Sequence, residues 1–311
     1  MANEFIYGGV GDPGDDLRLA EVFNSEVWLN LSDGTDIRDL CTRLRDMGGA
    51  GSDTIKAPYL ATSDAMAAAN ADEVTAAGNT LIADGQYSVT IAQQIIAFTV
   101  SDLFAITQGA GMMGMADLAR QAARAYVLRS TDMICDVIDG FTATVGTTTV
   151  DLTVDDIYSA QYQLTSSAVP GGSASCVLYP TQLTDFQNSL RSEGGSVQWE
   201  AASADMLAQK GPGFAGRWHG IDFYSSDSVV TANAGADSAG AMFNPRGVVF
   251  AEASAAAAMP GSVAAVVPAG SPVYAEFSRQ ADPGLSSLVA HAFVGVALGE
   301  DAAGVSIITD R

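Results

Sequence analysis

The sequence has very few residues of the kinds that carry acid–base or nucleophilic chemistry. Its 311 residues include only two histidines and three cysteines. Most enzymes that work by proton transfer or covalent catalysis use one of these side chains. The GxSxG motif of serine hydrolases is also absent. We therefore expect a protein without catalytic activity.

The same scarcity argues against a bound metal or a disulfide framework. Cys41, Cys135 and Cys176 are odd in number and far apart, and no CxxC pair occurs. We expect them to be reduced, buried side chains and not zinc ligands. His219 and His291 each fit a strand of the core, and they form a metal pair only if the fold brings them together. We expect neither a metal nor a cofactor.

Lysine is almost missing as well: Lys56 and Lys210 stand against twelve arginines, and the formal net charge is −22. Such a field repels phosphates and anionic membranes, which argues against sequence-specific DNA binding. The acidity is typical of a highly soluble surface; adaptation to a salt-rich environment is the alternative. Carboxylate clusters, such as Asp155–Asp156, lack the spacing of calcium-binding loops and are interpreted as solvated surface or helix caps.

No long apolar run is present, and the N-terminus lacks the basic and apolar regions of a signal peptide, so we expect no membrane association. Gly109–Gly114 matches the dinucleotide motif GxGxxG. The segment before it is a weak strand, and the acidic residue at the right distance, Asp132, falls inside a predicted helix. A turn before that helix is the favoured interpretation, and a nucleotide-dependent enzyme is kept as an alternative.

Periodicity predicts an α+β chain. Helices are expected at 16–31, 37–47, 116–139, 154–164 and from 180 to about 193. Strands are expected at 54–60, 86–99, 175–179, 218–224, 247–251, 273–277, 288–297 and 305–309. Between the first two strands, residues 61–84 are rich in Ala, Asn and Asp, and we interpret them as part of a long projecting hairpin.

Several stretches, in this order and spacing, resemble the major capsid proteins of tailed bacteriophages and related archaeal tailed viruses. They are residues 21–33, 49–60, 79–93, 133–147, 177–207, 216–243 and 295–311. The resemblance spans nearly the whole chain and lies in the collinear order of these stretches, since none of them is a chemical motif.

The resemblance implies the Hong Kong 97-type capsid fold, divided into five parts. They are an N-terminal arm (1–48), an extended hairpin loop (49–100), a peripheral domain with a spine helix (101–169), an axial domain (170–245) and return strands of the peripheral domain (246–311). It also implies a subunit that forms the hexamers and pentamers of an icosahedral head enclosing double-stranded DNA. Such a subunit assembles in the host cytoplasm and ends in the virion.

The implied partners are other copies of the chain, a portal, a separate scaffolding protein and, in some viruses, a decoration protein. No cross-linking lysine is assigned. The residues we expect at contacts between copies are Arg38, Arg43, Arg45, Lys56, Glu73, Trp199 and Trp218, the tryptophans having a core role as an equal alternative. Another virion protein or a cell-surface lattice protein is the remaining structural alternative.

Overall fold

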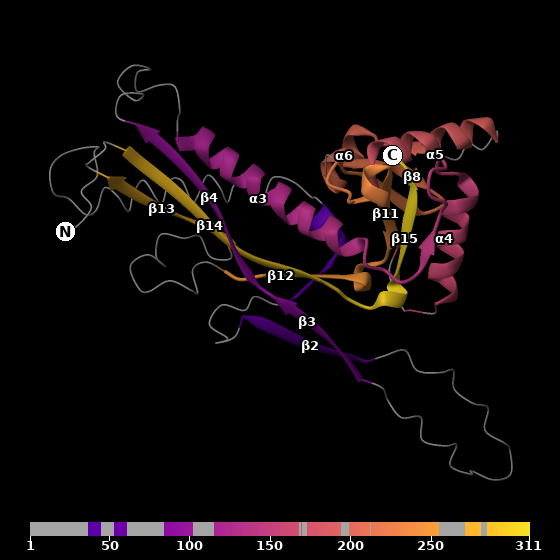
Figure 1. Ribbon diagram of the computed structural model, residues 1–311, viewed down its shortest axis with the longest axis horizontal. Helices are drawn as coiled ribbons and strands as arrows, with labels where there is room; N and C mark the ends of the chain where they lie inside the picture. Colours follow the sequence, from indigo (N-terminus) through magenta and orange to yellow (C-terminus); the bar gives the residue numbers. More distant parts are fainter. Residues whose placement is uncertain are drawn as a thin grey trace, which may run out of the picture.

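The computed structural model describes most of the chain. The described residues are 37–44, 53–60, 84–101, 115–167, 169, 173–193, 199–211, 213–254, 271–280 and 285–311. They form two large sheets, one two-stranded hairpin, and the helices that pack on them (Figure 1). This mixture confirms the predicted α+β class.

The first sheet has five strands, with the long strand β14 at its centre. Its strands are β1 (Thr42–Arg43), β4 (Ala92–Ser101), β12 (Val248–Glu252), β13 (Val273–Gln280) and β14 (Leu285–Leu298). Strand β14 pairs antiparallel with β4, β12 and β13, and β1 joins β12 in parallel. Along β4, partly buried Ile96 and Phe98 alternate with exposed Ile95 and Ala97, as expected of a strand with one covered face.

Helix α3 (Met115–Ile138) covers that face, as Figure 1 shows. Its buried side chains include Ala122, Tyr126 and Ile134, which belong to a cluster that also contains Ala290 and Ala292 of β14. The same cluster reaches Phe243 in the second sheet. Helix α3 therefore ties the two sheets into one body.

The second sheet has eight strands. They are β5 (Thr144–Val145), β6 (Ser175–Leu178), β7 (Glu200–Ala201), β8 (Phe214–Trp218), β9 (Ile221–Ser225), β10 (Thr231–Ala232), β11 (Asp237–Phe243) and β15 (Gly304–Asp310). Their order is β5-β15-β11-β6-β9-β8-β7, with β10 on β11. Every residue of β11 is buried, because the sheet is covered on both faces.

Helices α4 (Val154–Ser166) and α5 (Pro180–Ser192) contribute to a second cluster with this sheet, around Phe186, Phe223 and Ile307. Thr153 and Asp156 form a reciprocal capping box that starts α4. Helix α6 (Ala204–Lys210) follows β7, and Met206 in it packs against the first cluster. Short 3₁₀ turns occupy Ile37–Leu40, Asn233–Gly235, Pro245–Gly247 and Asp301–Ala303.

The hairpin pairs β2 (Thr54–Leu60) with β3 (Asp84–Thr90) and extends from the body (Figure 1). On its inner face, Ile55 and Val89 pack against Val249 and Ala251 of β12. The Tyr59 and Tyr87 rings stack with centroids 4.3 Å apart. The hairpin is therefore anchored at one end by a small apolar cluster.

Three sequence predictions need correction. Residues 37–47 were predicted as a helix, but a 3₁₀ turn at 37–40 is followed by strand β1, because Thr42 and Arg43 pair with β12. The predicted strand 218–224 is a tight hairpin, in which His219 adopts φ +48° and Gly220 φ +79°. The strand predicted at 86–99 is two strands, interrupted at Ile91, whose N–H bonds to the Asp53 carbonyl.

Two segments pack with a different sheet from the one that the expected division gives them. Strand β15 lies between β5 and β11, so residues 304–310 join the eight-stranded sheet and not the return strands of the other sheet. Helix α4 packs with the same sheet. The predicted helices at 116–139, 154–164 and after 180 are confirmed by α3, α4 and α5. The arm before residue 37, the segment 61–83 and the Gly109–Gly114 motif lie outside the described residues.

Candidate contact surfaces

The described residues hold no group of His, Cys, Asp and Glu side chains that could bind a metal. The two histidines lie in different sheets: His219 is in the β8–β9 turn, and His291 in β14, where its Nδ1 lies 2.9 Å from Gln93 Nε2. The His219 ring lies against Tyr158 and Trp218, whereas that of His291 lies against Tyr274, so the two rings share none of these neighbours. None of the described helices combines the length and apolar character that a membrane span requires.

Arg38, which we expected at a contact between copies, has its partners inside the same chain. Its guanidinium is buried, 3.7 Å from Glu252 and 5.2 Å from the centre of the Tyr126 ring. The Tyr126 hydroxyl donates a hydrogen bond to the same carboxylate. Burial, together with the charge of Glu252, raises the pKa of Tyr126 well above its ordinary value, which keeps it a donor. This group joins the residues before β1 to helix α3 and strand β12.

Lys210 and Arg217 are also used within the subunit. Both bind Asp222, at 2.5 Å from Lys210 Nζ and 2.7 Å from Arg217 Nε. Burial opposes ionisation of Asp222, but the hydrogen bonds from Arg217 and Lys210 outweigh it and lower the pKa of this carboxyl below its ordinary value. The triad fastens the end of helix α6 to the β8–β9 pair.

Arg43 and Lys56 are the candidate cations that remain at the surface. Arg43 forms an exposed pair with Asp39 at 2.5 Å, which balances its charge. Lys56 lies on the outer, polar face of the hairpin, opposite Ser88. No hydrogen bond or ion pair of Lys56 occurs within the described part of the chain. Arg45 and Glu73 fall outside that part.

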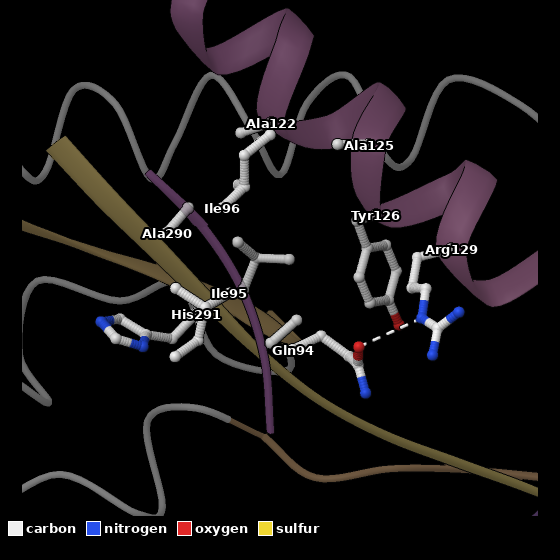
Figure 2. Close-up of a pocket in the computed structure, with 11 residues that line it drawn as sticks. Gln94, Ile95, Ile96, Ala122, Ala125, Tyr126, Arg129, Ala290 and His291 are labelled. Atoms are coloured by element: carbon white, nitrogen blue, oxygen red, sulfur yellow. Dashed lines mark hydrogen bonds between the residues drawn. The ribbon is translucent and has the colours of Figure 1, made fainter. Parts of the chain in front are cut away.

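A groove with a cavity volume of about 230 Å³ separates helix α3 from strand β4 (Figure 2). Its floor is made of small and apolar side chains, including Ile96, Ala122 and Ala290. At its edge, Arg129 Nε donates a hydrogen bond to Gln94 Oε1 at 3.1 Å, the dashed line in Figure 2. The lining contains no nucleophile placed against a base.

The two tryptophans expected at contacts, Trp199 and Trp218, lie within the second cluster. Trp218 is almost fully buried and Trp199 partly buried, and both rings pack against Phe186. The aromatic side chain that covers Trp218 from the surface is Tyr158 of α4, with ring centroids 5.0 Å apart. Sequence reasoning missed Tyr158 and its neighbour Tyr162, which are exposed. One signal was available, because residues 157–184 contain no charged residue and no histidine.

No model of a known protein family matches the chain, and no curated protein sequence matches it. Solved structures do match. A protein of Mycobacterium phage Che8 superposes with TM-score 0.58 at 18% identity, covering 88% of this chain and 90% of that one. The capsid of Ralstonia phage GP4 gives TM-score 0.59 at 13% identity, covering 88% and 87%.

The SrpI encapsulin complex of Synechococcus elongatus gives TM-score 0.60 at 12% identity, covering 99% of this chain and 93% of that chain. These superpositions include nearly the whole length of both partners. They establish the fold: the chain has the Hong Kong 97-type fold, shared by phage capsids and encapsulin, as the sequence resemblance predicts.

Proposed function

We propose that this chain is the major capsid protein of a tailed virus. Copies of it associate into hexamers and pentamers, and these close into an icosahedral head around double-stranded DNA. The observation that carries the proposal is the likeness, over almost the full length of both chains, to the capsid of Ralstonia phage GP4. The order of the sequence stretches described above supports the same conclusion.

The assignment of parts follows the fold, with the division that the sheets suggest. The hairpin of β2 and β3 is the extended loop, and α3 is the spine helix of the peripheral domain. We place α4 and β15 with the axial domain, because both pack into the eight-stranded sheet. In this proposal the chain assembles into heads in the host cytoplasm and is part of the finished virion. Its partners are a portal, a scaffolding protein and, in some viruses, a decoration protein.

Among the residues expected at contacts between copies, Lys56 has the strongest structural argument. It is a cation in a chain of net charge −22, and it stands on the outer face of the projecting hairpin with no partner among the described residues. Any neighbouring copy presents many carboxylates, with which Lys56 can form an ion pair that it lacks among the described residues of its own chain.

Electron microscopy of the protein isolated from its natural source, where its assembly partners are present, tests the function. We expect closed icosahedral particles; tubes or flat lattices would instead indicate a tail or cell-surface protein, and a stable monomer would refute assembly altogether. Because an encapsulin shares the fold, the contents of particles isolated from their natural source decide between the two containers. Nuclease-protected DNA supports a virus head, and an enclosed protein supports an encapsulin.

The contact role of Lys56 has a separate test. Lys56→Glu should leave the subunit folded and reduce the yield of closed particles. Arg191→Glu is the matched control, since Arg191 is exposed, lies on α5, and has no ion pair in the described residues. It makes the same change of charge. Normal particles from Lys56→Glu, or equal defects in both variants, would contradict the role.

A further inference from the structure

Beyond its first turn, the exposed side of helix α4 carries no charge, which is unusual for the surface of so acidic a chain; Asp155, in the first turn, borders the same side. After Asp155 in the first turn, the exposed positions of the helix are Tyr158, Ser159, Tyr162, Thr165 and Ser166. With 100° between successive residues, these five positions lie on one side of the helix. We call this set the tyrosine face.

The tyrosine face carries large aromatic area that the subunit leaves in solvent. Tyr162 is 74% exposed and Tyr158 is 43% exposed. Tyrosine is enriched where proteins meet, because the ring supplies contact area and the hydroxyl a hydrogen bond at low cost in rotamer entropy. Serine and threonine between the rings supply further hydrogen bonds without charge.

Tyr158 is already held in place by its own subunit. Its ring lies 5.0 Å from that of Trp218 and 5.7 Å from that of His219, and its hydroxyl is 3.4 Å from His219 Nε2. A side chain that is fixed before binding loses little conformational freedom on binding. Tyr158 is therefore prepared as an anchor, and Tyr162 lies one turn further along the same side.

The turn that presents His219 is strained. His219 has φ +48° and is followed by Gly220 at φ +79°, so both central residues are left-handed, as in a type I′ turn. Asn, Asp and Gly are the usual residues there, and histidine in this conformation costs about 1 kcal/mol or more. In this conformation the His219 imidazole packs against Trp218 and Tyr158, and its exposed ring extends the tyrosine face.

Charge identifies the partner. Two copies that each carry −22 repel one another, and carboxylates brought together in a contact would add to the repulsion. The tyrosine face itself carries no carboxylate and is bordered by Asp155 at one end, so a contact centred on the two tyrosines reduces that local cost, and salt screens the more distant charges. A nucleic acid finds no cation on this face, and a basic partner would gain more from the acidic surface elsewhere. The occupant that suits a neutral tyrosine surface is another copy of the chain.

We propose that the tyrosine face of α4 is a contact between two copies of this chain. The proposal rests on the proposed function, since it requires assembly, but it concerns a surface that the fold alone does not assign. In a ring of subunits such a contact is heterologous, so the face meets a different surface of the next copy.

Hydroxyl-radical footprinting of wild-type particles and of dissociated subunits tests the proposal directly. We expect oxidation of Tyr162 to fall about fivefold or more on assembly, as a side chain that is 74% exposed becomes an interface core residue. Closed particles in which Tyr162 is oxidised as fast as in free subunits would refute this contact and leave the proposed function intact. A chain that stays monomeric would refute both.

Substitutions give an independent test. Tyr162→Asp should prevent or weaken assembly while the circular dichroism and thermal midpoint of the subunit stay unchanged, because the side chain is exposed. Tyr162→Phe should assemble. Asn188→Asp, at an exposed position of neighbouring α5, adds the same charge outside the face and should assemble like the wild type. Normal particles from Tyr162→Asp, or an equal failure of Asn188→Asp, would overturn the proposal.

Discussion

Replacing Asp222 with asparagine should destabilise the isolated subunit by removing the charge that holds Lys210 and Arg217. The Asp222 side chain is 3% exposed, whereas those of Lys210 and Arg217 are 31% and 38% exposed. Losing one member of a fully buried ion pair costs about 3–5 kcal/mol, because the remaining charge is left without compensation. Here the remaining cations can turn to water, so we expect a smaller loss of about 2 kcal/mol.

Urea unfolding of dilute subunits near neutral pH measures this loss as a lower midpoint with an unchanged slope. Asp136→Asn is the matched control, since Asp136 is exposed on α3 and has no ion pair among the described residues. It makes the same change of charge and should shift the midpoint little. A control that lost as much stability would show that net charge, and not the triad, accounts for the effect.

The pH dependence gives a second check with a definite sign. The folded-state pKa of Asp222 is depressed, so its contribution to stability is present above its unfolded pKa, about 3.9, and is lost as the pH falls through the lower folded value. The difference between wild type and Asp222→Asn should therefore shrink below about pH 4. A difference that stayed constant into stronger acid would refute the assignment of the stabilisation to an ionised Asp222.

Three further predictions concern other parts of the subunit. Thr153→Ala removes the capping box of α4 and should cost about 1 kcal/mol in urea unfolding, whereas Thr153→Ser should cost far less. Gly240→Ala would bring a Cβ to 2.8 Å from the Val177 carbonyl oxygen inside the sheet, and should cost about 1–3 kcal/mol. Gly213→Ala is its control, since the added Cβ would lie 3.5 Å from the Ser225 carbonyl oxygen, an ordinary contact distance, and the change should cost little. Tyr126→Phe removes the hydrogen bond to Glu252 and should lower the thermal midpoint by a few degrees, about 1 kcal/mol; an unchanged midpoint would contradict this.

Helices and strands could be predicted from the sequence where one face of the segment is buried and the other is exposed to solvent. The alternation that begins at Tyr87 predicted β3, and the apolar stripe of 116–139 predicted α3 to within a residue at each end. Strand β11 was missed because DSAGAMF is buried on both faces and therefore shows no alternation. The β8–β9 hairpin was missed because His219 occupies a turn position usually filled by Asn, Asp or Gly.

The contact residues were less predictable, and the cations show why. Scarcity singled out Arg38, but its partner Glu252 is distant in sequence and only the fold brings the two together. Lys56 is also one of the scarce cations, and the structure leaves it exposed, so its place at a contact stays a prediction. Scarcity of a residue type marks it as significant without distinguishing an internal ion pair from a contact with a neighbour. That distinction needs the partner's position.

The use of cations inside the subunit also limits how copies can hold together. Arg38, Arg43, Lys210, Arg217 and Arg246 are all engaged with carboxylates of their own chain. Apart from these pairs, nine basic residues of the chain stand against 32 acidic residues, so carboxylates far outnumber the cations that could pair with them across an interface. Attraction between copies must then come mainly from uncharged surface, such as the tyrosine face, and salt acts by screening repulsion. Assembly should therefore strengthen as ionic strength rises, the opposite of a shell held by salt bridges. Light scattering across a salt series decides between the two, and particles that dissociate in high salt would refute this account.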